Sequence, residues 1–96
     1  MKLEKSKKRI AKRVKMGFQG YPEISIAYSG QSKELAEGVI VTFVAEEGAS
    51  PMEEKFQTKA DAREDEVIQS AIVKIIERSE AKTVKMVDGI TIAPRF

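Results

Sequence analysis

Residues 36–45 read AEGVIVTFVA, and this stretch decides the fold. Alternate residues of a strand point to opposite faces of a sheet. Both faces of this strand are largely apolar: one carries Val39, Val41 and Phe43, and the other carries Ile40, Thr42 and Val44. We therefore expect a central strand in a sheet that is covered on both sides. The second cover would be either the N-terminal helix or another chain.

Two flanking strands are predicted around this centre. Before it, Ile24, Ile26 and Tyr28 alternate with more polar residues, which is typical of a strand with one apolar face. After it, residues 52–58 alternate more weakly and carry several charges, as expected of an edge strand. The three aromatic residues Tyr28, Phe43 and Phe56 are expected in or near the core.

The clearest helix runs from residue 61 to about residue 79. Its apolar residues recur at helical spacing, and they are Val67, Ile68, Ala71, Ile72, Ile75 and Ile76. Asp61 precedes Glu64 by three residues, which predicts a capping box at the start of the helix.

The chain after this helix contains two short apolar runs, residues 82–87 and 90–93, on either side of Asp88-Gly89. This pair favours a two-residue hairpin turn. The predicted fold class is therefore α+β, a two-layer sandwich with a mostly antiparallel sheet of four or five strands in the order α-β-β-β-α-β-β. One long helix would pack on one face of the sheet.

The N-terminal segment is strongly basic. Residues 1–16 hold eight basic side chains against one acidic, a net charge of +7, whereas the other 80 residues hold nine against fourteen, a net charge of −5. Ile10 and Val14 lie four residues apart, so residues 6–16 predict a short helix, with Ser6 capping its start and Gly17 its end. We expect a single domain, residues 1–96, with a basic helix or arm at 1–16 and an α+β body at 21–96.

Composition excludes many chemistries. The chain of 96 residues has no cysteine, histidine or tryptophan, which removes disulfides, thiolate and imidazole ligands, and catalysis that depends on histidine or cysteine. No leader-like or membrane-spanning run is present, so we expect a cytoplasmic protein without a membrane partner. The glycines form no phosphate-binding loop. No cofactor, metal, catalytic residue or small-molecule ligand is predicted.

The basic segment is the one candidate site. We expect it to bind a polyanion such as nucleic acid through phosphate contacts made by Lys5, Lys7, Lys8, Arg9, Lys12, Arg13 and Lys15. The chain would then be a non-enzymatic binding or assembly domain. One alternative is a module for self-association, as a dimer, or for binding a protein partner, in which the basic arm of one chain docks on an acidic body. A second alternative is a small enzyme that uses carboxylate and lysine chemistry.

Two clusters of acidic residues are candidate cation sites. Glu46 and Glu47 with Glu53 and Glu54 form one, and the carboxylates of residues 61–66 form the other. Neither has the spacing of a calcium loop, so we interpret both as solvated charges.

Five short motifs resemble those of a family of small, uncharacterised bacterial proteins. They are Gly20-Tyr21-Pro22, Ile26-Ala27-Tyr28-Ser29-Gly30, Glu47-Gly48-Ala49-Ser50-Pro51, Asp61-Ala62-Arg63-Glu64-Asp65 and Val84-Lys85-Met86-Val87-Asp88-Gly89-Ile90. The resemblance implies relatives with a tail of cysteine and histidine that could bind metal. This sequence contains neither residue type, so the resemblance implies no metal role and no activity for it.

Overall fold

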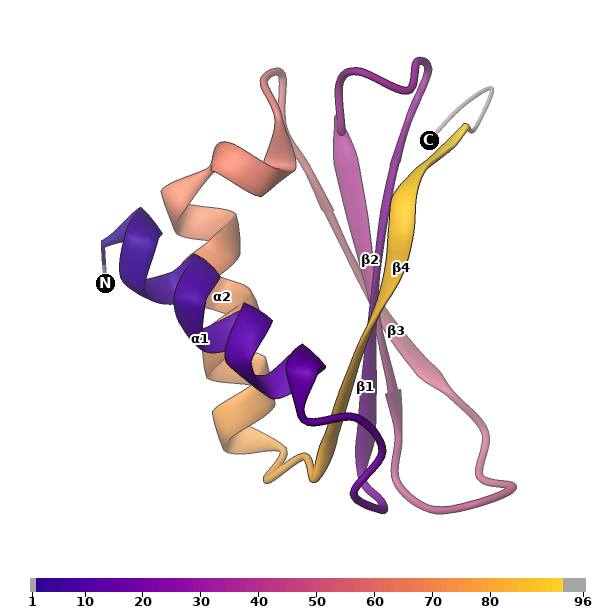
Figure 1. Cartoon of the computed structure of the whole chain (residues 1–96). Coiled ribbons are helices and arrows are strands. Elements are labelled where there is room, and N and C mark those ends of the chain that lie inside the picture. The colour runs from indigo at the N-terminus through magenta and orange to yellow at the C-terminus, as the bar shows by residue number, and fades with distance from the viewer. Residues whose placement is uncertain (1, 93–96) are drawn as a thin grey trace.

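The chain forms a four-stranded mixed sheet with two helices packed on one of its faces (Figure 1). The structure is a computed structural model that describes residues 2–92. The elements in order are α1 (Leu3–Lys15), β1 (Glu23–Gly30), β2 (Gly38–Val44), β3 (Met52–Gln57), the 3₁₀ turn η1 (Ala62–Glu64), α2 (Glu66–Arg78) and β4 (Thr83–Ile92). The predicted α+β class is confirmed.

The strands lie in the order β3-β2-β1-β4, which places β2 inside the sheet and β3 at an edge, as predicted. β1 pairs antiparallel with β2, and β2 pairs antiparallel with β3, but β4 runs parallel to β1. The sheet is therefore mixed rather than fully antiparallel. Parallel neighbours need a crossover connection, and the chain reaches β4 from the opposite edge of the sheet through α2.

The core lies between the sheet and the helices. Ile24, Ile26 and Tyr28 of β1 are buried there, and Val39 and Val41 of β2 lie beside them. Phe43 and Phe56 pack against this core from the end of β2 and from β3. All three aromatic residues therefore lie where the sequence predicts them.

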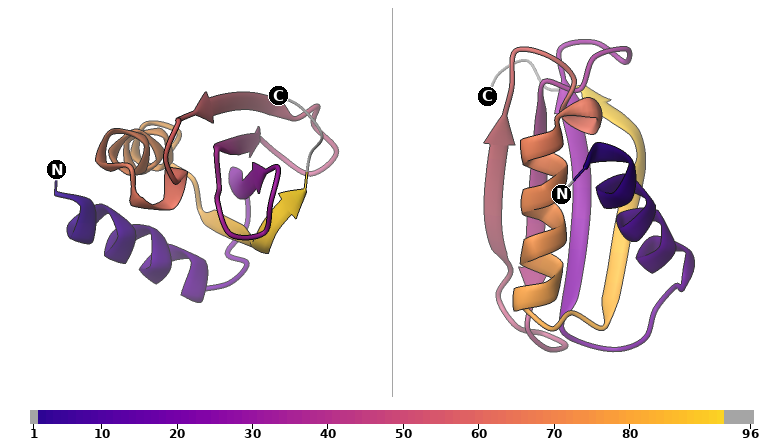
Figure 2. Two further views of the ribbon diagram at one scale, coloured as in Figure 1. Left: turned by 90° about the horizontal axis from the view of Figure 1, so that it is seen from above. Right: turned by 90° about the vertical axis from the view of Figure 1, so that its left-hand side faces the viewer.

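The second face of β2 is not covered by the N-terminal helix, which rules out the first of the two predicted covers and leaves another chain as a prediction. Two perpendicular views show α1 and α2 side by side on the same face of the sheet (Figure 2). The opposite face carries Ser25, Ala27 and Thr42 around Ile40 and Val44, all five only half-buried. Small and polar side chains offer little apolar area to a helix, so α1 gains more by packing beside α2.

The predicted terminal hairpin is also wrong, because β4 is one continuous strand. Its pairing with β1 shifts register between Ile26 and Tyr28, where Asp88 and Gly89 lie. Gly89 has a positive φ of 72°. Glycine meets that requirement in a bulge as well as in a hairpin turn. The dipeptide alone could not distinguish the two. Of the four or five strands predicted, the sheet has four over residues 2–92, and residue 93 of the predicted run 90–93 lies outside the described residues.

Neither helix begins at the residue that the sequence predicts. α1 starts at Leu3, and Ser6 is a buried interior residue instead of the cap, although Gly17 follows the helix end with a positive φ of 74° as expected. α2 starts at Glu66, and the side chain of Asp65 accepts the Ile68 amide at 3.0 Å.

The predicted capping box and one predicted core residue are corrected as well. Asp61 caps η1 by accepting the amide of Arg63, so no box with Glu64 forms. Val67 is 79% exposed in the first turn of α2, whereas Ile68, Ile72 and Ile76 are buried. The predicted period of the helix is therefore right over its centre and wrong at its start.

Candidate binding surfaces of the N-terminal helix

One stripe of α1 anchors the helix to the rest of the chain. Ser6 and Ile10 are fully buried and Val14 is half-buried, and these positions are four residues apart on one face of the helix. The Ser6 and Ser70 hydroxyls lie 3.3 Å apart across the α1/α2 interface. Two serines have little bulk, so the two helices approach closely at this point. The N-terminal segment is thus an integral part of the fold and not a detached arm.

Three of the seven predicted phosphate-binding residues are held by the body of the chain. The Lys7 ammonium lies 2.5 Å from a carboxylate oxygen of Glu64, and the Arg9 guanidinium lies 3.3 Å from Glu77. Arg13 donates to the backbone carbonyl of Ala81. We call Lys7, Arg9 and Arg13 the inner cations. The Glu64 carboxylate also raises the pKa of Lys7, so its ammonium stays charged.

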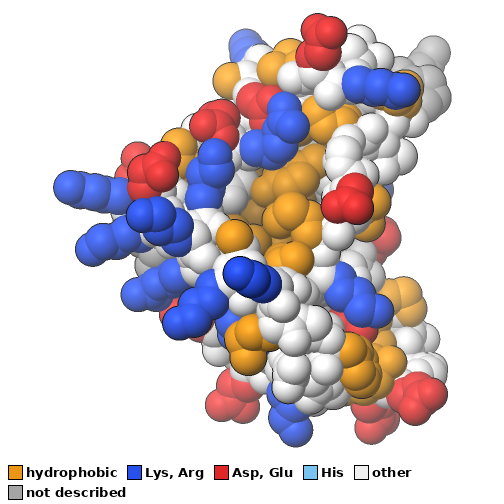
Figure 3. All heavy atoms as spheres, in the orientation of Figure 1, with side chains coloured by type: hydrophobic (Ala, Val, Ile, Leu, Met, Phe, Trp, Pro, Cys, Tyr) orange, Lys and Arg blue, Asp and Glu red, His pale blue; other side chains and the backbone are white. Residues whose placement is uncertain are grey.

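The other four predicted residues form a row on the outside of α1. Lys5, Lys8, Lys12 and Lys15 follow one another at intervals of three or four residues, and all four side chains are exposed. Residues at this spacing lie on one helix face. Within residues 2–92, none of them is in an ion pair. We call them the outer lysines, and Figure 3 shows lysine and arginine side chains gathered over α1.

The inner side of α1 also borders an apolar groove that the sequence did not predict. The groove has a volume of about 630 Å³ and lies between α1 and the neighbouring strands β1 and β4. Its aliphatic lining comes from Ile10, Ala11 and Val14 of α1 and Met86 of β4. Figure 3 shows the apolar surface exposed between the lysine-rich helix and the edge of the sheet.

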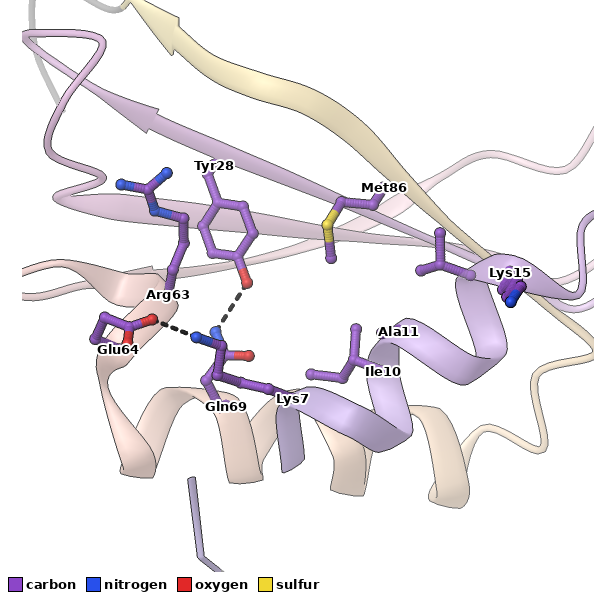
Figure 4. A pocket seen from close by; sticks show the side chains of 10 residues that line it. Lys7, Ile10, Ala11, Lys15, Tyr28, Arg63, Glu64, Gln69 and Met86 are labelled. Atoms are coloured by element: carbon purple, nitrogen blue, oxygen red, sulfur yellow. Dashed lines mark hydrogen bonds and ion pairs between the residues drawn. The ribbon is translucent and has the colours of Figure 1, made fainter. Parts of the chain in front are cut away.

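Polar groups gather at one end of the groove (Figure 4). The Tyr28 hydroxyl accepts a hydrogen bond of 2.8 Å from the side-chain amide of Gln69, which also donates to the Ala62 carbonyl at 2.9 Å. Tyr28 is 5% exposed, and its burial raises the pKa of the phenol, so the hydroxyl keeps its proton at neutral pH. Lys7, Arg63 and Glu64 complete this end.

The turn η1 is fixed by Asp61. This carboxylate accepts from the Arg63 guanidinium at 2.5 and 2.8 Å and from the Arg63 amide at 2.9 Å. The hydrogen bonds and the adjacent positive charge lower the pKa of Asp61 to about 2. Asp61 thereby holds the turn on which Glu64, the partner of Lys7, is carried.

The acidic residues considered as cation ligands do not gather in the described part of the chain. Asp61 and Asp65 each serve as a cap, and Glu64 pairs with Lys7. Over residues 2–92, no group of three or more carboxylates is placed to share a cation. Likewise, no helix in this range has the length and hydropathy needed to cross a bilayer.

One feature of the sequence could have indicated the groove. Tyr28 is the one residue with a polar group among the apolar residues of its strand face, and a buried phenol needs a hydrogen-bond partner. Its partner Gln69 lies 41 residues away in the chain, so sequence patterns alone could not pair the two.

Comparison with known proteins gives no family for this chain, since no family model, curated protein or solved structure matches it. The function is therefore argued from the surfaces of α1.

Proposed function

We propose that this chain is a polyanion-binding domain whose outer lysines contact the phosphates of a nucleic-acid duplex. The observation that carries the proposal is the row of four exposed lysines with no acidic partner within residues 2–92. Lys5 and Lys15 are ten residues apart, which corresponds to about 15 Å along a helix. Four ammonium groups over that length match a phosphate backbone, whose charges follow one another at a few ångströms.

The inner cations do not belong to the proposed contact surface. A phosphate would have to displace Glu64 from Lys7, Glu77 from Arg9 and the Ala81 carbonyl from Arg13, whereas the outer lysines are in no ion pair within residues 2–92. The proposed interface therefore holds Lys5, Lys8, Lys12 and Lys15 only. Such contacts recognise the charge of the phosphates and not the base sequence, so binding is expected to be salt-dependent and non-specific.

The test is a fluorescence-anisotropy titration of mixed-sequence DNA and RNA duplexes between 50 and 200 mM salt. Four phosphate contacts predict a slope of log K against log salt near −3.6 on B-DNA, or about a 150-fold loss of affinity over this range. The double variant Lys8→Gln/Lys12→Gln should bring the slope to about −1.8. A deletion of residues 1–16 is a poorer test, because it also removes Ile10 from the core.

A matched control removes the same charge elsewhere. Lys55 and Lys59 are exposed on β3 and just after it, at the opposite side of the sheet from α1. Lys55→Gln/Lys59→Gln changes the net charge equally and should leave the slope unchanged. Equal losses in the two double variants would mean that net charge, and not the outer lysines, drives binding. No binding of either duplex at 50 mM salt would refute the proposal.

A second candidate function is self-association through the sheet face that neither helix covers. Ile40 and Val44 lie on this face and are only half-buried. Sedimentation velocity at high micromolar concentration separates the two candidates. The mass of a single chain would count against self-association, whereas a dimer that binds no duplex would favour it over the polyanion proposal.

A further inference from the structure

The groove beside α1 has the properties of a small-molecule site. Its volume of about 630 Å³ lies within the range of roughly 300–1,000 Å³ that ligand pockets occupy. Its walls are mainly aliphatic, and its polar groups lie together at one end, except for Lys15 at the other end (Figure 4). This arrangement suits a molecule with an apolar body and a single polar head.

The head would meet a buried hydroxyl that has a proton to donate. Tyr28 is buried, with an exposed fraction of 5%. Its oxygen accepts from Gln69, but no atom of residues 2–92 accepts the phenolic proton. A phenol can donate one hydrogen bond as well as accept. Figure 4 shows the hydroxyl directed toward Gln69 and the Lys7 ammonium, with Ile10 and Met86 farther along the groove.

The charges at the groove favour an anionic head. Lys7, Lys15 and Arg63 line the groove against Glu64, and Asp61 beside it pairs with Arg63, so three cations face two carboxylates and a net charge of +1 remains. A ligand carboxylate beside Tyr28 would compete with Glu64 for Lys7. Both partners of this ion pair are exposed, at 39% for Lys7 and 60% for Glu64. Exposed pairs are worth little, so Glu64 can be displaced into solvent.

We propose that the groove binds an amphipathic carboxylate, with the carboxylate on the Tyr28 hydroxyl and the Lys7 ammonium and the apolar body along Ile10, Val14 and Met86. Of the outer lysines only Lys15 lines the groove, at the end away from Tyr28. The proposed head contacts do not use Lys15, so the proposal does not rest on the proposed function. Decanoate is a suitable probe, because its ten-carbon chain carries one carboxylate. Decanol is the matched probe with the same chain and no charge.

Titration followed by amide NMR shifts tests the site. Decanoate should bind about tenfold more tightly than decanol and should shift residues of α1, β4 and η1. Lys7→Gln should remove most of that preference and leave decanol binding unchanged, which separates charge recognition from a loss of fold. Tyr28→Phe should weaken decanoate binding about ten- to a hundredfold, the usual value of one hydrogen bond to a charged group. The variant Lys8→Gln/Lys12→Gln should bind decanoate as the parent chain does.

A second pair of variants addresses the apolar body without touching the head contacts. Met86 is 36% exposed at the groove, and Val67 is 79% exposed on α2 outside it. Met86→Glu places a charge among the apolar contacts and should abolish binding of both probes, whereas Val67→Glu should not alter it. Equal affinities for decanoate and decanol, retained binding by Met86→Glu, or shifts confined to the uncovered sheet face would each overturn the proposal.

Discussion

The inner and outer cations alternate along the same thirteen-residue helix, yet they have opposite surroundings. Lys7, Arg9 and Arg13 each contact an oxygen of the body, while the outer lysines extend into solvent. Angular position around the helix axis, and not residue type, separates the two sets. A count of basic residues therefore overstates the proposed binding surface: the sequence predicts seven contact residues, and three of these contact the body of the chain.

The largest expected effect on stability comes from truncating Ile10, which anchors α1 to the rest of the chain and so determines which cations face inward. Ile10 is 2% exposed between α1, α2 and the sheet. Ile10→Ala should lower the free energy of unfolding by about 2–4 kcal/mol through lost burial and a cavity. Lys12→Ala, on the outer side, should stay within about 0.5 kcal/mol. Urea denaturation followed by circular dichroism measures both, and similar values would mean that α1 has no fixed inner side.

A smaller loss of stability is expected from a change in η1, the turn that carries Glu64, the partner of Lys7. Asp61→Asn retains an oxygen to cap η1 but loses the charge that pairs with Arg63. The variant should be less stable by about 1.5–3 kcal/mol near pH 6, which is typical of a hydrogen bond to a charged group. The folded-state pKa of about 2 lies below the ordinary value of 3.8, so the stabilisation is present above roughly pH 4 and is lost toward pH 2.

Urea titrations of the parent chain and Asp61→Asn at several pH values check this dependence. The two stabilities should converge as the pH falls from about 4 to 2. A constant difference at every pH would show that the Asp61 charge does not stabilise the turn.

The smallest effect concerns the exposed ion pair of an inner cation. A double-mutant cycle with Lys7→Gln and Glu64→Gln should give a coupling of about 0.2–1 kcal/mol, and it should shrink with added salt. The equivalent cycle with Lys8 and Glu64 should give none, since the structure pairs Glu64 with Lys7. Equal coupling energies in the two cycles would mean that an inner cation and an outer lysine do not differ in their interaction with Glu64.

The sequence predicts the parts of this fold that local periodicity controls. The alternation of Ile24, Ile26 and Tyr28 places β1 correctly, because a period of two reports burial directly. The doubly apolar run at residues 39–44 places β2 inside the sheet but does not show what covers its second face. The same reasoning fails at Asp88-Gly89, where a bulge and a hairpin turn need the same backbone angle. It also fails for Ser6, whose polarity suggests a cap but whose small size suits a helix contact.

The two candidate sites also differ in whether the sequence alone could predict them. The outer lysines could be predicted because they lie close together in sequence. The groove could not, because Ile10, Tyr28, Gln69 and Met86 come from four elements spread along most of the chain. Their juxtaposition depends on the parallel placement of β4 beside β1, which no local pattern reports.

The contact between Ser6 and Ser70 spans 64 residues of sequence, and this separation has a consequence during translation. At about 5–20 residues per second, Ser70 is added roughly 3–13 seconds after Ser6. A thirteen-residue helix is marginal in water on its own. The inner cations can contact Glu64, Glu77 and the Ala81 carbonyl only after each of those residues has been added. A nascent chain that pauses before residue 64 therefore exposes all seven cations, and the inner set becomes unavailable only as the body is completed.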